Sequence, residues 1–344
     1  MERLVEREEP LRGLQARLRR AASGRGGVVV VRGEPGIGKS ALVSALLASV
    51  PAGGRSLLGR CDDLATPRPL GALREALGQE PAPSATGADV AAGLVEELRS
   101  AATGTPTLLV LEDVHWADQA TLDAVTVLGR RAARLPLLLV LTLRPGELAD
   151  GHPLPATLEG LAPATTMTVE PQPLSRSGVA ALARAYGKAD PGGEEARRVH
   201  VLSAGNPLYA LELLAAGLDP AAPSLQHVVR GRVARLPPAT RQALEVLALS
   251  PSWLPYPVLD RVHPEWASAL EPAERHGLLR VARDGLGFHH ELVRLVLASQ
   301  TGLGRQRLLH RRLLSALEEA GAEATVLVHH AEVAVAHALP AVGG

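Results

Sequence analysis

Residues 28–41 read VVVVRGEPGIGKSA and decide the fold. Four β-branched apolar residues run directly into 33–40, which match the pattern GxxxxGK[ST], and helix-forming residues follow. This order predicts a strand, then a loop whose backbone N–H groups point at phosphate oxygens, then a helix that adds its positive N-terminal end. The stretch therefore predicts a phosphate-binding loop rather than an ordinary glycine-rich turn.

The loop implies a task for its polar residues. Lys39 is expected to reach the β- and γ-phosphates of ATP, and Ser40 is expected to ligate Mg²⁺. The chain has only two lysines, Lys39 and Lys188, so a chance match to the pattern is improbable. The residues of this loop expected to bind ATP or ADP are Gly33, Gly36, Ile37, Gly38, Lys39, Ser40 and Ala41.

Composition bounds the class of protein. The 344 residues are 46% hydrophobic and 21% charged, as in a well-packed globular protein, and the formal net charge is zero. Residues 221–344 contain 13 Arg against 11 Asp plus Glu, so they lack the charge excess of a nucleic-acid binder. We expect DNA contact only through regions or partners outside this chain.

Redox and targeting signals are few. Cys61 is the single cysteine, which excludes an internal disulfide and fits a reducing compartment. No apolar run approaches the roughly 18 residues of a membrane span, and residues 1–10 have no signal-peptide core. The expected location is the cytoplasm, without membrane contact.

Further apolar runs predict the rest of a sheet. Strands are expected at 55–61, 107–111, 137–143 and 166–169, with helical patterns between them. This alternation predicts an α/β fold, a P-loop NTPase with a parallel, doubly wound sheet whose ligands bind beyond the carboxyl ends of the strands. The residues expected at that edge are Gly33, Glu112, Asp113 and Arg144.

Two acids and one arginine are expected to complete the site. Glu112 and Asp113 end a strand where a Mg²⁺-linked carboxylate belongs, and they should alternate across that strand. One acid would hold metal-bound waters while the other orients the attacking water, and the sequence leaves open which does which. Arg144 ends the next strand, within expected reach of a γ-phosphate. The expected catalytic residues are Lys39, Glu112, Asp113 and Arg144.

The second half of the chain reads as helical. A hairpin expected at 278–288, turning at 283–285, indicates a winged-helix-like unit. His289 and His290 would point to opposite faces of a strand, which argues against a metal site there. The expected domains are a nucleotide-binding domain at 1–170, a helical lid at 171–236, a winged-helix-like domain at 237–300 and the start of a helical, repeat-like segment at 301–344.

With these residues in view, the chain resembles the signal-transduction ATPase (STAND) module of LuxR-family, MalT-like bacterial transcriptional regulators, an AAA+-like class. The matching pieces are VERE at 5–8, GEPGIGKS at 33–40, LLVLEDVHWAD at 108–118, LTLRPGE at 141–147, SAGNPLYALELL at 203–214 and FHHELVR at 288–294. Glu6 stands where the family usually has glycine.

The resemblance implies further roles. Pro207 would pack near adenine, Val5 and Arg7 would lie on the adenine side, Arg144 would sense the γ-phosphate, and His290 would touch the phosphates in the ADP state. It also implies a switch that ADP holds closed and ATP opens, with nucleotide-dependent self-association, slow hydrolysis and a protein or small-molecule inducer. The family continues into a helical-repeat sensor and a helix-turn-helix, and this chain is expected to have room for the first helices of the sensor but none for the helix-turn-helix.

Three other functions remain open from the sequence. The first is a nucleotide-stabilised protein-interaction module without turnover, and the second is a stand-alone AAA+-like ATPase. The third is a kinase that uses the same loop, although we find no motif for an acceptor pocket or a base.

Overall fold

The computed structural model describes residues 4–61, 69–78, 85–100, 105–148, 151–187, 193–219, 221–250, 253–322 and 324–335. The chain divides into two compact units, Met1–Pro173 and Leu174–Gly344. The finer division of the second unit into lid, winged-helix and repeat-like parts stays a prediction, and part of the last of these, 336–344, lies outside the described residues.

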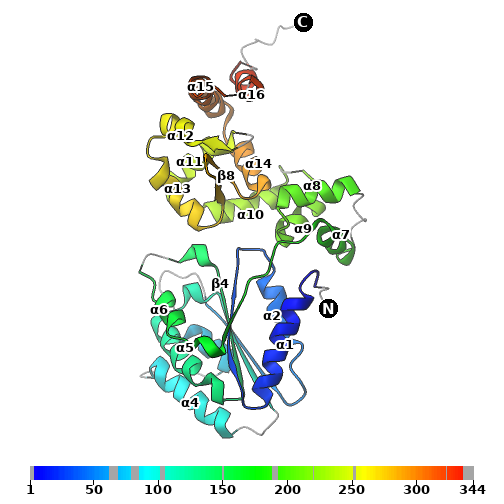
Figure 1. The fold of residues 1–344 in the computed structure, drawn as a ribbon, viewed down its shortest axis with the longest axis vertical. Helices are drawn as coiled ribbons and strands as arrows, with labels where there is room; N and C mark the ends of the chain where they lie inside the picture. The colour runs from blue at the N-terminus through cyan, green and yellow to red at the C-terminus, as the bar shows by residue number, and fades with distance from the viewer. Residues whose placement is uncertain are drawn as a thin grey trace. The chain divides into compact units, whose positions relative to one another are not determined.

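The first unit is built on a five-stranded parallel sheet. Its strands have the order β2-β3-β4-β1-β5 (Figure 1). Each strand pairs in parallel with its neighbours. Their bounds are β1 Gly27–Arg32, β2 Arg55–Arg60, β3 Thr107–Glu112, β4 Leu137–Leu143 and β5 Thr166–Val169. The predicted α/β fold and its strands are confirmed, and the strand that leads into the phosphate loop lies inside the sheet.

Helices cover both faces of this sheet. In Figure 1, α1 and α2 lie on one face and α4, α5 and α6 on the other. The helices are α1 Glu8–Ala22, α2 Lys39–Leu47, α3 Gly71–Leu77, α4 Gly87–Ser100, α5 Gln119–Arg131 and α6 Leu154–Glu159, with 3₁₀ turns η1 Val114–Trp116, η2 Ala132–Arg134, η3 Pro145–Glu147 and η4 Pro163–Thr165. A continuous apolar run such as 137–143 is what a strand covered on both faces requires.

The valines of β1 show how one strand serves two cores. Val28 and Val30 pack in the core beneath α4 and α5, whereas Val29 and Val31 pack with α1 and α2. All four are at most 5% exposed. Because side chains of a strand alternate between faces, β1 is anchored from both sides, and the loop that follows it starts from a fixed point.

Two helix starts in this unit have local causes. Helix α1 begins at Glu8, because Glu6 has the left-handed φ of 53° and turns the chain before the helix. Glycine would adopt that conformation without strain. Asp118 caps α5, since its carboxylate accepts the N–H of Thr121 at 3.0 Å.

The second unit combines helices with a small antiparallel sheet of order β6-β8-β7. Its strands are β6 Leu254–Pro255, β7 Leu279–Val281 and β8 Gly285–Phe288. Its helices are α7 Arg176–Ala185, α8 Gly193–Ser203, α9 Pro207–Ala215, α10 Pro223–Val233, α11 Pro238–Ala248, α12 Tyr256–Val262, α13 Trp266–Arg275, α14 Glu291–Gln300, α15 Leu303–Glu319 and α16 Ala324–Val335. The predicted hairpin is confirmed as β7 and β8.

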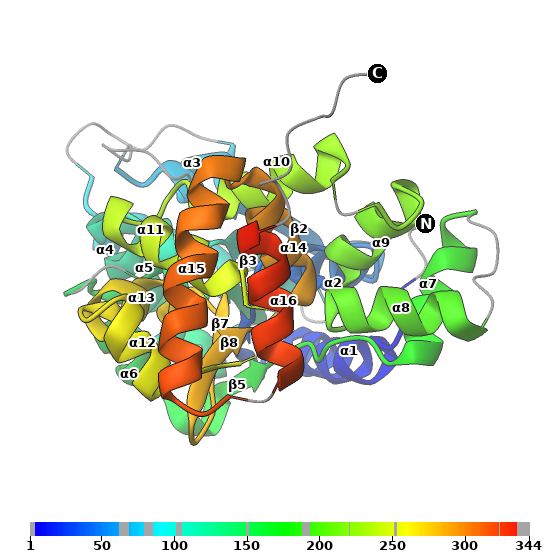
Figure 2. The same ribbon diagram turned by 90° about the horizontal axis from the view of Figure 1, so that it is seen from above.

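Three details of this unit differ from the sequence reading. The two-residue strand β6 was not expected, since so short an apolar stretch carries no period. The helical stretch that begins at residue 303 is two helices, α15 and α16, which lie side by side (Figure 2). Strand β8 ends at Phe288, so His289 and His290 are not strand residues, and His290 directly precedes α14.

No helix within the described residues is long and apolar enough to cross a membrane.

Candidate nucleotide-binding site

The phosphate loop connects β1 to α2 and needs glycine at two of its positions. Gly36 has a φ of 80° and Gly38, which directly precedes α2, has a φ of 102°. Only glycine adopts such angles at low cost. At the start of the loop, the Gly33 N–H donates to the Leu143 carbonyl at 3.3 Å. The loop is therefore tied to the end of β4, next to Arg144.

Lys39 lies inside this loop. It is 7% exposed, and its Nζ donates to the carbonyls of Gly33 at 2.7 Å and Glu34 at 3.1 Å. Burial, followed by the charge of Arg144, lowers the pKa of its ammonium to about 8, against the opposing effect of carboxylates led by Asp113. Ser40 follows at the first turn of α2, and this residue is exposed. An ammonium and a hydroxyl thus stand at the positive end of a helix.

Arg7 lies behind the loop. It is 3% exposed, and its guanidinium donates from Nη2 to the Ile37 carbonyl and from Nη1 to the Glu6 carbonyl, both at 2.9 Å. A Cβ at Gly38 would lie 3.7 Å from Arg7 Nε. Burial lowers the pKa of this guanidinium, with Glu6 and Glu8 acting in the opposite direction. Arg7 thus supports the backbone of the loop, in addition to the adenine-side role that the resemblance implies.

The two acids at the end of β3 face different partners. Glu112 lies opposite Arg60 of β2, with 3.4 Å between Glu112 Oε2 and Arg60 Nε. Asp113 leaves the strand with a φ of 54°, and its Oδ2 lies 3.4 Å from Arg144 Nη2. The expectation that the two acids alternate across one strand is corrected, because β3 ends at Glu112 and the left-handed turn at Asp113 separates them. Asp113 is accordingly the acid on the side of Lys39 and Arg144.

A buried side chain fixes that turn. The backbone N–H of Asp113 donates to Thr142 Oγ1 at 2.9 Å, and Thr142 is 2% exposed. Thr142 lies near the end of β4 and Arg144 directly follows that strand, which pairs with β1 on one side and with β3 on the other. The register of three strands therefore brings together Lys39, Asp113 and Arg144, three of the predicted site residues.

Three residues of this edge had no predicted role. Glu147 Oε1 and Oε2 each accept from Arg144 Nη1 at 3.1 Å, and Glu147 Oε2 lies 3.4 Å from His115 Nε2. The Arg144 guanidinium carbon lies 5.0 Å from the centroid of the Trp116 ring, a cation–π contact. Their only signal in the sequence was membership of the HWAD and RPGE stretches.

Neighbouring groups keep the Glu147 side chain ionised. Burial raises the pKa of this carboxyl, but the interaction with His115 and the charge of Arg144 outweigh it and lower the pKa to about 2. Glu147 is thus a carboxylate at neutral pH.

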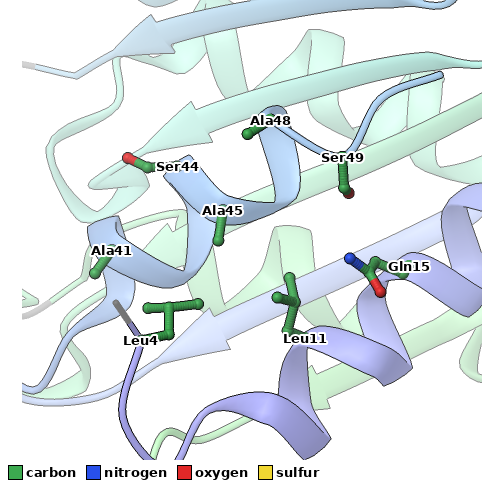
Figure 3. Close-up of a pocket in the computed structure, with 8 residues that line it drawn as sticks. All are labelled: Leu4, Leu11, Gln15, Ala41, Ser44, Ala45, Ala48 and Ser49. Atoms are coloured by element: carbon green, nitrogen blue, oxygen red, sulfur yellow. The ribbon is translucent and has the colours of Figure 1, made fainter. Parts of the chain in front are cut away.

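A pocket of about 450 Å³ lies between α1 and α2 (Figure 3). Leu4, Leu11 and Gln15 line it from the α1 side, and residues of α2 and its C-terminal end line the other side. The α2 residues begin with Ala41, directly after Ser40, so one end of the pocket adjoins the phosphate loop. The remaining lining residues are Ser44, Ala45, Ala48 and Ser49.

Pro207 and His290 belong to the second unit. Pro207 opens α9 behind Asn206, whose side chain accepts the Leu208 N–H at 3.1 Å, and Gly205 has a φ of 76°. His290 is fully buried, and its Nδ1 lies 2.9 Å from the Ser203 carbonyl. Its ring meets Tyr209 edge-on, with centroids 5.1 Å apart. Within this unit, His290 is thus packed against the turn that carries Asn206 and Pro207.

The donor set suits a magnesium ion. Mg²⁺ takes one or two hydroxyl or carboxylate oxygens from the protein and keeps water molecules at its other coordination positions. Ser40 is exposed, and the Asp113 side chain is 26% exposed, whereas the Glu112 side chain is only 12% exposed and is paired with Arg60. Both acids have an arginine partner at 3.4 Å, so Ser40 with either acid would suit the ion, and Asp113 is the more exposed of the two acids.

Comparison with known proteins agrees with this site. Residues 3–140 match the family model of the AAA ATPase domain, so this part of the chain is similar to a P-loop ATPase domain of that type. The matched residues include the phosphate loop and both acids, but neither Arg144 nor the second unit. No curated protein matches the chain.

Solved structures are similar to the chain at low identity. The Walker-type ATPase of Pyrococcus abyssi is 17% identical, with a TM-score of 0.56 over 86% of this chain and 96% of that one. A STAND protein with a tetratricopeptide repeat sensor from Pyrococcus horikoshii is 16% identical, with a TM-score of 0.37 over 94% of this chain and 47% of that one. The Orc1 protein of Aeropyrum pernix in complex with DNA is 16% identical, with a TM-score of 0.49 over 87% and 94%.

Proposed function

We propose that this protein is an ATP- and ADP-binding molecular switch with slow ATP hydrolysis. The observation that carries the proposal is the position of Lys39, whose buried ammonium donates to two carbonyls of the phosphate loop. The same loop is hydrogen-bonded to the end of β4, directly before Arg144. Phosphate oxygens would replace those carbonyls as partners of Nζ. The family match over residues 3–140 supports nucleotide binding.

Each group at the edge then has a role. The loop from Gly33 to Ala41 would bind the phosphates, and Lys39 would neutralise charge on the γ-phosphate. Asp113 would orient the attacking water or a metal-bound water, and Arg144 would hold a γ-phosphate oxygen. Bound Mg²⁺, held by Ser40 and Asp113, would supply positive charge against the phosphates. The Ala41 end of the pocket, near Val5, would receive the base.

The regulatory part of the proposal rests on the sequence resemblance. The chain would be the switch module of a LuxR-family, MalT-like regulator, with Pro207 near adenine and His290 sensing the ADP state. ADP would favour a resting form, and ATP, exchanged in response to a protein or small-molecule inducer, would favour self-association in the cytoplasm. Any contact with DNA would come from other regions or partners.

Calorimetry in the presence of Mg²⁺ tests the proposal. It measures the affinity of the full chain and of Lys39→Ala for ATP and for ADP. We expect the variant to lose at least about tenfold in affinity, because a buried charge-assisted contact to phosphate is removed. Lys188→Ala, at the only other lysine, is the matched control and should bind like the unaltered chain. Equal affinity in the Lys39 variant would contradict the proposal.

A nucleotide-bound interaction module without turnover is the second candidate. It is favoured by the arginine partners of both acids, since Arg60 faces Glu112 and Arg144 faces Asp113. Phosphate release by the unaltered chain and by Asp113→Asn separates the two candidates. Release above background that the substitution abolishes supports the switch, whereas release at background in both supports the module.

A further inference from the structure

The guanidinium of Arg144 is held at its two ends by different carboxylates. Nη1 donates to both oxygens of Glu147 at 3.1 Å, whereas Nη2 reaches Asp113 Oδ2 only at 3.4 Å. The Arg144 side chain is 22% exposed and that of Glu147 is 11% exposed. The Glu147 contact is therefore the shorter and the more protected from water, and the Asp113 contact is the one that a phosphate oxygen can replace.

Glu147 also lies against His115. His115, whose side chain is fully buried, places Nε2 3.4 Å from Glu147 Oε2 and Nδ1 3.9 Å from Asp113 Oδ1. The His115 ring also packs against Trp116, with centroids 4.5 Å apart, and the other contact of Trp116 in this group is the Arg144 guanidinium. His115 and Trp116 come from the turn after β3, whereas Arg144 and Glu147 come from the turn after β4. The group thus joins two neighbouring strand ends.

From these contacts we propose that Glu147, braced by His115, is a positioning residue that presents Arg144 Nη2 to the γ-phosphate. This inference rests on the proposed function. Arginine has three side-chain bonds beyond Cβ to fix, and a partner on Nη1 removes most of that freedom before the nucleotide arrives. ADP lacks the γ-phosphate, so the positioning should affect ATP binding and not ADP binding.

The test compares dissociation constants for ADP and for a non-hydrolysable ATP analogue, each with Mg²⁺, in the full chain and in Glu147→Gln. Glutamine keeps the size of the side chain and removes its charge. We expect the preference for the ATP analogue over ADP to fall about tenfold, while the ADP constant stays within about twofold. Glu147→Asp keeps the carboxylate and should restore part of the preference.

Glu97→Gln is the matched control. Glu97 also pairs with an arginine, Arg55, but at the opposite edge of the sheet, where β2 begins. It should leave both constants unchanged. Thermal unfolding of each free variant reports whether the fold is retained.

The double variant Arg144→Ala/Glu147→Gln distinguishes positioning from a general structural effect. If Glu147 acts through Arg144, the double variant shows the same preference as Arg144→Ala alone. If Glu147→Gln keeps the preference for the ATP analogue over ADP while Arg144→Ala loses it, the inference is overturned and the proposed function stands. An equal loss for ADP and the ATP analogue also overturns it. Absence of all nucleotide binding in the unaltered chain overturns the proposed function itself.

Discussion

Asp113 donates its backbone N–H to the side chain of Thr142, 29 residues later in the chain, at 2.9 Å. This bond links the end of β3 to the last residues of β4 and fixes the left-handed turn that sends the Asp113 carboxylate toward Arg144. One hydroxyl thus determines which of the two neighbouring acids joins the phosphate side of the sheet.

Thr142→Val tests the contribution of this hydroxyl. Valine fills the same volume but leaves the Asp113 N–H without its acceptor, so we expect a loss of about 1–2 kcal/mol in the free energy of unfolding, measured in urea. Thr126→Val is the control, because the Thr126 hydroxyl only adds a bond to the Leu122 carbonyl within α5, and it should cost less than about 0.5 kcal/mol. Equal effects would show that the turn does not depend on Thr142.

Gly38→Ala should distort the phosphate loop. A Cβ would have room there, with Arg7 Nε 3.7 Å away, but the φ of 102° strains any other residue by about 1–2 kcal/mol. We expect lower stability and weaker nucleotide binding, by urea denaturation and calorimetry. Gly93→Ala, at an exposed position of α4 with open space around it, should instead stabilise the protein by about 0.5–1 kcal/mol. If both substitutions changed the free energy of unfolding in the same direction, the argument would be contradicted.

Lys39 should take up protons when nucleotide binds above neutral pH. Its pKa in the free protein is lowered to about 8, and phosphate charge beside Nζ would raise it again. Binding at pH 8 should therefore take up roughly half a proton, and affinity should fall as the pH rises from 7 to 9. Calorimetry in buffers of different ionisation enthalpy measures the uptake. Lys39→Arg stays charged throughout and should show none of this uptake.

Packing of α16 on α15 should weaken in acid. His310 Nδ1 and His330 Nδ1 lie 2.9 Å apart and both rings are buried. Burial and neighbouring histidines lower the pKa of His330 to about 4 and also lower that of His310. A histidine whose folded pKa lies below its unfolded value near 6.5 stabilises the fold above that value and loses this contribution as the pH falls toward 4.

We therefore expect the free energy of unfolding to drop by about 1–3 kcal/mol between pH 7 and pH 5 through this pair. His330→Asn keeps a group able to bond His310 but does not titrate, so part of the pH dependence should disappear. His227→Asn, at an exposed position of α10, is the control. The assignment is wrong if both variants keep the full dependence of the unaltered chain.

The sequence was informative wherever the signal was local. The valines at 28–31 predicted a strand, and each of them is buried in β1. The glycines and Lys39 of the loop predicted a phosphate site, and the structure shows left-handed angles at Gly36 and Gly38 with Lys39 inside. Apolar runs and loop patterns of this kind depend on neighbours in the chain, so they can be read without the fold.

The remaining features depend on contacts distant in sequence. Nothing local shows that Asp113 adopts a φ of 54°, since the Thr142 hydroxyl that accepts its N–H lies on another strand. The interaction of Glu147 with His115 joins two loops and likewise requires the register of β3 and β4. Arg7 was read from its motif alone, whereas its bond to the Ile37 carbonyl depends on how α1 meets the sheet.

The strand that leads into the phosphate loop, β1, has β4 on one side and β5 on the other, whereas β2 and β5 lie at the margins of the five-stranded sheet. When an edge strand frays, its backbone amides become exposed to solvent, whereas the amides of the inner strands stay hydrogen-bonded. Deuterium should therefore enter the amides of β2 and β5 well before those of β1. Fraying of an edge strand would then leave the nucleotide pocket intact. The chain would lose its edge strands before it releases its nucleotide.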